Sequence, residues 1–280
     1  MLASLDAALA AALQPVQVMV VDNGSTDDTP SLLARWAERG AGRSWFGVDS
    51  PGKSRAINAA LQRTVAPFVA FTDDDVQLAP NWIREIAHFF ARHPEYQAGM
   101  GRVLVPTEVT DSRIRKKALA FHTLPFFDRG DSVGDTEIAY GCNMVVRRSV
   151  FEQIGSFDER LGPGAGGAYE DVDFAVRMRR SGMPIGYMPS VVVYHDVDPA
   201  RLTMKYFREF HLRNTRCRFE ADRSCASWRN GLRALEASAS IVWHSLGRSE
   251  ERRLRAQRRL IQHAELLRLH LQARRRQSTA

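Results

Sequence analysis

Two short apolar runs, each followed by acidic residues, constrain the fold of this chain more than any other feature. The first run spans residues 16–21 (V-Q-V-M-V-V) and stops at Asp22. The second spans residues 67–71 (P-F-V-A-F) and leads within two positions to the triplet at residues 73–75 (D-D-D). Short, nearly continuous apolar runs rich in β-branched residues are typical of strands that are buried on both faces of a sheet.

Helical patterns surround these two runs. Leucines recur at spacings of three and four near the N-terminus, and apolar residues keep to one face within residues 31–39 and 54–64. Such alternation of strands and helices predicts right-handed β-α-β units and a layered α/β domain. Ligands of open α/β sheets bind beyond the carboxyl ends of the strands. The acids after the two runs are therefore expected at a binding site.

The clustering of four carboxylates at those strand ends predicts a cation site. Asp22 and the triplet at 73–75 would repel one another, and their pKa values would rise, unless a cation were present. Mg²⁺ or Mn²⁺ is the natural partner of carboxylate oxygens and commonly bridges substrate phosphates. The alternative is that the triplet caps a helix beginning near Pro80-Asn81, but one aspartate would be enough for that.

A second group of motifs lies between residues 141 and 167. A turn and strand at residues 141–148 (G-C-N-M-V-V-R-R) is followed by G-S-F-D-E at 155–159 and by a glycine-rich stretch at 162–167 (G-P-G-A-G-G). The glycine-rich stretch lacks the Lys-Ser/Thr pair of a P-loop, so it is not expected to cradle phosphate by that motif. Its composition instead predicts a mobile loop that closes over a substrate.

The glycine-rich stretch leads directly to two adjacent carboxylates, Glu170 and Asp171, at the start of a predicted helix over residues 169–180. Acids in a first helical turn also suit the helix dipole, which is the alternative reading. Paired carboxylates beside a mobile loop are candidates for general-base catalysis. A further strand at residues 191–194 ends at His195, which is either a metal or phosphate ligand or a structural histidine.

The positive charge of the chain is concentrated near its C-terminus. The net charge is +7, while residues 252–276 alone hold nine Arg and one Glu. A nearly neutral remainder argues against a nucleic-acid-binding face across the domain. The arginine-rich tail could contact anionic lipid, RNA or another protein, or it could be a solvated helix face.

Cysteine usage and hydropathy indicate a cytosolic chain. The three cysteines are odd in number and show no C-x-x-C spacing, which fits reduced thiols better than a disulfide framework or a zinc site. They are Cys142, Cys217 and Cys225. No apolar run approaches the roughly 20 residues that are needed to span a bilayer.

Taken together, the motifs resemble those of a family 2 glycosyltransferase with the GT-A fold. The ordered set is V-M-V-V-D-N-G-S-T-D-D-T, G-K-S-R-A-I-N-A-A-L, F-T-D-D-D-V-Q-L-A-P-N-W-I, G-C-N-M-V-V-R-R, G-S-F-D-E and Y-E-D-V-D-F-A-V-R-M-R-R-S-G. The resemblance covers residues 1–200 and implies a Rossmann-like α/β domain, with a mixed, mainly parallel sheet flanked by helices. Residues 201–280 would form a helical, basic C-terminal extension.

The resemblance also implies roles for individual residues. Asp22, Lys53, Arg55, Asp73 and Asp74 would bind the nucleotide-sugar donor. The D-x-D motif maps onto residues 73–75, so that Asp75 and Asp73, together with His195, would hold Mg²⁺ or Mn²⁺. The E-D motif maps onto Glu170 and Asp171, and Asp171 would be the catalytic base.

The implied activity is inverting, metal-dependent transfer of a sugar from a nucleotide-sugar to a hydroxyl of a glycan, lipid or similar acceptor. The enzyme would work in cell-envelope polysaccharide synthesis, in the cytoplasm or at the inner face of the membrane. Its arginine-rich tail would contact anionic lipid there, and no nucleic-acid partner is expected.

The pattern departs from the family in one respect, because the strand with a P-T-x-N-like turn that ordinarily opens it is absent before the first helix. We therefore expect weak donor binding and an exposed apolar groove. One alternative function is a degenerate, non-catalytic nucleotide- or glycan-binding module. A second is a nucleic-acid-binding protein acting through the arginine tail, which would show steep salt dependence.

Overall fold

The computed structural model describes residues 1–106, 112–246 and 249–278, and its chain folds into two compact units. Unit 1 comprises Met1–Leu104 and Phe127–Asp196, and unit 2 comprises Val105–Phe126 and Val197–Ala280. Segment 105–126 thus belongs to the same unit as the C-terminal residues, whereas the sequence predicts one domain boundary near residue 200. That boundary stays a prediction.

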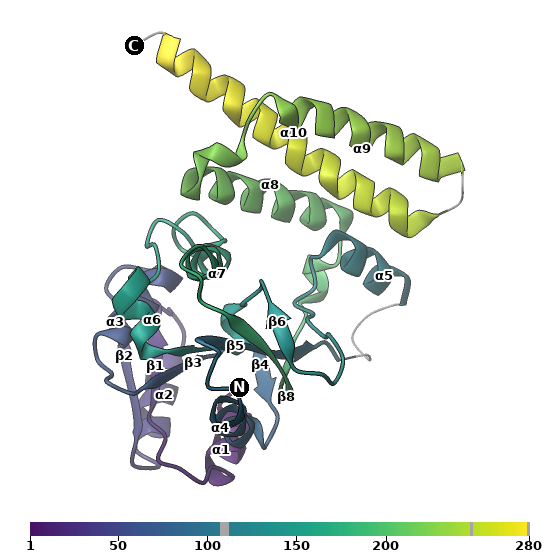
Figure 1. Cartoon of the computed structure of the whole chain (residues 1–280). Helices are drawn as coiled ribbons and strands as arrows, with labels where there is room; N and C mark the ends of the chain where they lie inside the picture. Colours follow the sequence, from purple (N-terminus) through teal and green to yellow (C-terminus); the bar gives the residue numbers. More distant parts are fainter. Residues whose placement is uncertain (107–111, 247–248, 279–280) are drawn as a thin grey trace. The chain divides into compact units, whose positions relative to one another are not determined.

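Unit 1 alternates helices and strands along the chain (Figure 1). Its first half holds α1 (Leu2–Ala10), β1 (Val18–Asp22), α2 (Thr29–Ala37), β2 (Arg43–Gly47), α3 (Lys53–Leu61), β3 (Phe68–Phe71), β4 (Val76–Leu78), α4 (Trp82–Arg92) and β5 (Ala98–Leu104). Its second half holds β6 (Gly134–Thr136), a 3-10 turn (Gly141–Asn143), β7 (Met144–Arg147), α6 (Arg148–Ile154), α7 (Glu170–Arg180) and β8 (Ile185–His195).

The larger sheet has the strand order β3-β7-β5-β8-β4, with β6 paired to β8. Within it β5 and β8 run parallel, whereas β7 lies antiparallel between β3 and β5, and both β4 and β6 are antiparallel to β8. The predicted mixed α/β sheet with flanking helices is confirmed, although antiparallel pairs outnumber parallel ones among the described strands. The sequence pattern missed this because β4 and β6 are only three residues long, and because the residues of β7, although predicted as a strand, do not reveal its direction.

A separate two-stranded sheet joins β1 and β2, which run parallel and are connected through α2. A β-α-β unit is thus present, but its second strand is β2, which was not predicted, rather than the predicted strand at residues 67–71. Within the described residues, β1 pairs with β2 alone and β3 with β7 alone, so each strand has one unpaired edge. Four of the five β1 residues are half-buried and Ala70 of β3 is exposed, so neither strand is buried on both faces as predicted.

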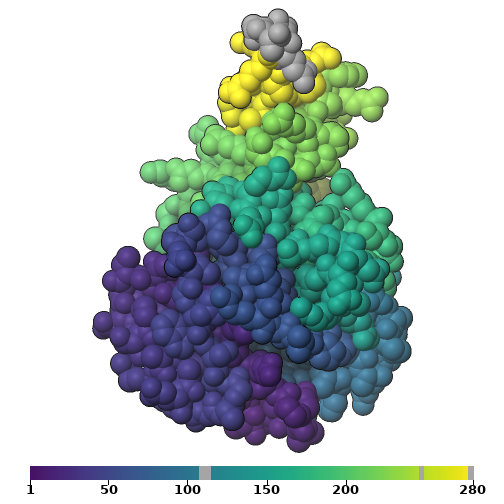
Figure 2. Space-filling model, turned by 90° about the vertical axis from the view of Figure 1, so that its left-hand side faces the viewer, coloured from purple at the N-terminus to yellow at the C-terminus, as the bar shows by residue number. Residues whose placement is uncertain are grey.

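The core of unit 1 lies between the larger sheet and its helices. Its fully buried side chains include Met100, Met144, Phe174, Met178 and Tyr187. Phe71 of β3 lies edge-on to Phe151 of α6 and to Phe157 of the following loop, and Phe157 stacks on Phe174 of α7 with centroids 4.6 Å apart. Figure 2 shows the purple N-terminal residues of unit 1 on the left of the view, and blue residues on the right beneath the teal residues of its later part.

Unit 2 is helical. It contains α5 (Ser112–Phe121), α8 (Met204–Ala221), α9 (Arg229–Leu246) and α10 (Glu250–Ser278), together with short 3-10 turns. The long helix α10 packs against α5, α8 and α9. Buried His211 holds α8 to the end of α5 through a hydrogen bond between its Nε2 atom and the Phe121 carbonyl, and burial lowers its pKa to about 4. No helix among the described residues combines the length and hydropathy that a membrane crossing requires.

Candidate functional site

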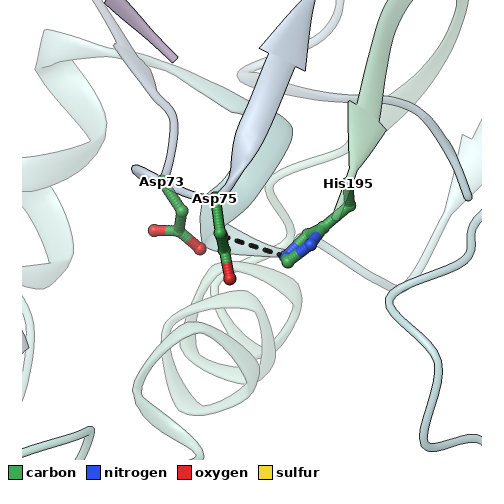
Figure 3. A group of neighbouring side chains, drawn as sticks. All are labelled: Asp73, Asp75 and His195. Carbon is green, nitrogen blue, oxygen red and sulfur yellow. Dashed lines mark ion pairs between the residues drawn. The ribbon is translucent and has the colours of Figure 1, made fainter. Parts of the chain in front are cut away.

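The carboxyl end of β3 and the end of β8 bring Asp73, Asp75 and His195 together (Figure 3). One potential ligand atom from each residue lies within 4.8 Å of the others. His195 Nε2 is 3.4 Å from an Asp75 oxygen, and Val76 pairs with His195 where β4 meets β8. Residues 120 positions apart in the chain therefore meet because β4 and β8 are neighbouring antiparallel strands.

The contacts of His195 orient its imidazole ring so that Nε2 could coordinate a metal ion. Its Nδ1 atom lies 2.8 Å from the Asp196 carbonyl, an oxygen that can only accept, so Nδ1 carries the proton. The lone pair of Nε2 then points toward the aspartates, which is the arrangement of a metal-binding histidine. Burial, together with the nearby Asp73 and Asp74, raises the pKa of the Asp75 carboxyl, although His195 acts to lower it. Two carboxylates and an imidazole nitrogen that faces them fit a divalent cation.

The alternative in which the acidic triplet caps a helix is wrong. Strand β4 lies between the triplet and α4 in the sequence. Helix α4 begins at Trp82, and its N-cap residue is Asn81 rather than an aspartate of the triplet. Asp74, predicted to bind donor, is exposed and is not part of the Asp73–Asp75–His195 cluster.

Lys53, the first residue of α3, joins the D-x-D motif to the E-D motif. Its ammonium nitrogen lies 2.7 Å from Asp73 Oδ1 and 3.7 Å from Glu170 Oε1. Despite partial burial, which would lower it, the pKa of Lys53 is raised because Asp73, Glu170 and Asp171 surround it. Lys53 is therefore an internal counter-ion that keeps the two acidic motifs next to each other.

Glu170 and Asp171 begin α7, and the chain reaches them through a sharp turn. Tyr169 has a φ of 83°, which is uncommon for a bulky residue. Burial raises the pKa of both carboxyls, and the Asp171 charge raises that of Glu170 further, whereas Lys53 lowers both. Carboxyls with raised pKa values are the type of group that general-base catalysis requires.

Backbone amides orient the Asp171 side chain. Gly141 N donates to Asp171 Oδ2 at 3.2 Å, and Val172 N donates to Oδ1 at 2.8 Å. These bonds direct the carboxylate toward the turn at residues 140–143. There, burial and the Asp171 charge raise the pKa of Tyr140 to about 12. The site thus combines a candidate cation site and a candidate base, linked by Lys53.

The turn after β1 is connected to the start of α3. Asp22 is buried and accepts a hydrogen bond from Ser25 N, and Asn23 Oδ1 accepts one from Gly52 N at 2.6 Å. Arg55 forms an ion pair with Glu159 at 3.5 Å and donates to the carbonyls of residues 50 and 51. The structure thus places Lys53 among the acids, while Arg55 is held on the other side of the same helical turn.

The glycine-rich segment at residues 162–167 packs on the start of α3. Lys53 N donates to the Pro163 carbonyl at 2.9 Å, and Ser54 Oγ donates to the Leu161 carbonyl at 2.8 Å. A methyl group on Gly164 would lie 3.0 Å from the Gly52 backbone, so the two glycines permit this close approach. The segment that was predicted to be mobile is anchored in this structure, and its closure over a substrate stays a prediction.

Sequence reasoning missed the contribution of Asn143. This fully buried amide accepts from Trp82 Nε1 at 2.8 Å and donates to the carbonyls of Arg102 and Val191. It thereby fixes the turn that presents Gly141 N to Asp171. The available signal was a polar residue directly before the strand Met144–Arg147, whose first three residues are apolar. A buried amide at such a position must have hydrogen-bond partners.

Comparison with protein families assigns the chain to a family. The model described as glycosyl transferase family 2 matches residues 1–155, more than half of the chain. The chain belongs to glycosyl transferase family 2. The family predicted from the motifs is confirmed, and with it the assignment of this chain as a glycosyltransferase.

Two curated relatives of this family 2 member come from bacteria. The chain is 29% identical to an N-acetylglucosaminyl-diphospho-decaprenol L-rhamnosyltransferase of Mycobacterium tuberculosis, covering 86% of this chain and 87% of that protein. It is 28% identical to the succinoglycan biosynthesis protein ExoM of Rhizobium meliloti, covering 61% of this chain and 54% of that protein.

Solved structures share the fold of this glycosyltransferase. The mannosyltransferase PcManGT from Pyrobaculum calidifontis, solved with GDP-Man and Mn²⁺, has a TM-score of 0.54 and 20% identity, covering 97% of this chain and 71% of that one. The S. aureus TarS 1–349 complex with UDP has the same TM-score with 17% identity, covering 79% of this chain and 62% of that one.

Proposed function

We propose that this glycosyltransferase inverts the anomeric centre of a sugar that it moves from a nucleotide-sugar to a hydroxyl of a lipid-linked acceptor, with help from a divalent cation. The observation that carries the proposal is the Lys53 bridge. It places the Asp73–Asp75–His195 cluster next to the Glu170–Asp171 pair. A single displacement is accelerated by positive charge that stabilises the leaving group and by a base for the incoming hydroxyl, and this arrangement could supply both.

Asp75, Asp73 and His195 would hold Mg²⁺ or Mn²⁺. The fit rests on two carboxylates and a histidine whose Nε2 lone pair is free to coordinate. When bound, the ion supplies Lewis-acid stabilisation of the negative charge that develops on the departing diphosphate. The Mn²⁺ complex of PcManGT supports this choice of ion.

The protein side chains supply the remaining steps. Asp171 takes the proton of the acceptor hydroxyl while the acceptor oxygen bonds to the anomeric carbon. The carbon–oxygen bond to the nucleoside diphosphate breaks, and its electron pair leaves with the diphosphate. Attack from the opposite face inverts the centre, and Lys53 and Arg55 stabilise the leaving charge. Glu170 keeps Lys53 in place.

We further propose that Asp22, at the end of β1, and Asp74 contact the nucleoside part of the donor. Asp22 is buried beside the turn that Asn23 ties to Gly52, so the pocket wall for a nucleoside would be rigid there. The acceptor proposal is supported by the Mycobacterium tuberculosis relative, whose name specifies a decaprenol-linked acceptor. Work on such an acceptor at the inner face of the membrane fits an arginine-rich tail that contacts anionic lipid.

The proposal is tested by measuring release of nucleoside diphosphate from a panel of nucleotide-sugars, with a polyprenyl-diphosphate-linked sugar as acceptor. The assay is run with Mn²⁺, with Mg²⁺ and with a chelator. We expect turnover only with a metal ion, and a product of inverted configuration by NMR. Full turnover in chelator, or loss of neither binding nor turnover in Asp75→Ala, would overturn the metal-dependent mechanism.

A further inference from the structure

The surface of α9 carries an apolar stripe that nothing in the described structure covers. Large apolar side chains of this segment are exposed, among them Trp228 at 63%, Leu235 at 67% and Trp243 at 73%. The full set, called the α9 stripe below, is Trp228, Leu232, Leu235, Val242 and Trp243. At 100° per residue these five positions fall within an arc of about 100° on one side of the helix.

The opposite side of α9 is the one that packs on α10, and it is made of small or polar residues. Asn230 is fully buried and lies 3.3 Å from His263 of α10 through its amide nitrogen. A methyl group on Gly231 would lie 3.2 Å from Leu267, and Ala237 is buried. Most large apolar residues of α9 therefore face away from α10, and half-buried Ile241 is the exception on the packed side. Contiguous exposed apolar surface of this kind marks an interaction site.

The charge of unit 2 indicates which partner fits the stripe. The residues of unit 2 include 23 Lys and Arg against 10 Asp and Glu, whereas those of unit 1 include 16 against 22. Arg229 and Arg233 are exposed on one flank of the stripe, beside Glu236, and the Arg229 guanidinium lies over the Trp228 ring. The positive charge therefore extends well beyond the C-terminal tail to which the sequence assigned it.

We propose that the α9 stripe inserts into the interface of an anionic lipid bilayer, with the basic residues of unit 2 contacting the headgroups. Trp side chains near both ends of the stripe suit the boundary between acyl chains and headgroups. An amphipathic helix with one apolar face lies in the plane of that boundary, and here the positive charge comes from unit 2 as a whole. A second copy of the chain fits less well, because pairing two stripes would bring two strongly basic units together.

The test is co-sedimentation of the full chain with vesicles of phosphatidylcholine alone and of phosphatidylcholine mixed with phosphatidylglycerol. A triple variant, Leu232→Ser with Leu235→Ser and Trp243→Ser, removes apolar area without changing charge. The matched control is Leu13→Ser with Val65→Ser, two exposed apolar residues of unit 1. Equal thermal midpoints of all three proteins show that folding is preserved.

We expect the native chain and the control to bind the anionic vesicles, and the triple variant to bind at least about tenfold more weakly. Trp emission should shift to the blue on binding, because Trp228 and Trp243 are exposed, while Trp36 and Trp82 are buried and Trp45 is half-buried. The assay contains neither donor nor acceptor, so a failure here leaves the proposed reaction untouched.

Three results would overturn the proposal. Equal binding by the native chain and the triple variant would assign membrane contact to arginines alone. Equal binding to neutral and anionic vesicles would remove the role of the basic residues. Absence of binding, with a native dimer that the triple variant dissociates in sedimentation velocity, would show that a second copy covers the stripe.

Discussion

Lys53 supplies the positive charge that the acidic residues of the candidate site share. One ammonium group lies in contact with Asp73 and Glu170 and near Asp171, so the acids of two motifs more than 95 positions apart share a counter-charge. Asp73, Asp75, His195 and Asp171 could be proposed from motif positions. The bridging role of Lys53 could not, because motif spacing says nothing about which acids a flexible lysine reaches.

At this scale, Asp171→Asn should lower kcat by about 10² to 10⁴-fold while leaving donor affinity unchanged, because the amide cannot accept the acceptor proton. Diphosphate release gives kcat, and calorimetric titration gives donor affinity. Asp173→Asn is the matched control, since Asp173 lies on the same helix and pairs with Arg177 at 2.8 Å. A comparable loss in Asp173→Asn would argue that α7 is merely disturbed.

Lys53→Met should move the acid limb of the pH dependence of kcat/KM to higher pH. Lys53 lowers the pKa values of Glu170 and Asp171, so its removal raises them further. The base works deprotonated, and a higher pKa therefore demands a higher pH for the same activity. Arg55→Met, which removes a cation paired with Glu159, should leave the limb in place. An unshifted limb in Lys53→Met would rule out this coupling.

At the scale of elements, the amphipathic helices and the apolar strands β1, β3 and β7 were predicted, whereas β2, β4, β5 and β6 were missed. Segment 169–180 was predicted as a helix, and α7 spans Glu170–Arg180. β2 was missed because R-S-W-F-G is short and carries charge, and its pairing with β1 is what completes the β-α-β unit. The attachment of residues 105–126 to unit 2 depends on long-range packing, for instance of Phe121 on Phe207, that no local pattern reveals.

Gly164→Ala should lower both stability and donor affinity, because the loop is packed on the start of α3. Gly164 has a φ of 84°, and an added methyl would meet the Gly52 backbone at 3.0 Å. Gly130→Ala is matched for backbone strain, with a φ of 82° and no atom near the added methyl. The control should cost about 1–2 kcal/mol in urea unfolding, and Gly164→Ala clearly more. Equal costs and an unchanged donor Kd would show that the contact is unimportant.

At the scale of the whole molecule, the candidate cation site joins the two sequence segments that make up unit 1. Asp73 and Asp75 come from Met1–Leu104, and His195 comes from Phe127–Asp196. Mn²⁺ at 100 times its Kd should stabilise the folded chain by about 2.7 kcal/mol, seen as a raised thermal midpoint. Asp75→Ala should abolish the shift, whereas Asp74→Ala, at an exposed neighbour outside the cluster, should retain it. A shift that survives Asp75→Ala would place the ion elsewhere.

The unpaired edges of β1 and β3 have a practical consequence for handling the protein. An exposed row of backbone amides and carbonyls on an apolar strand is a template for pairing with another chain. Residues 68–71 (F-V-A-F) carry no charge that would discourage such pairing. Concentrated preparations should therefore aggregate through edge-to-edge strand addition, and dilution or a short strand-capping peptide should keep the protein dispersed.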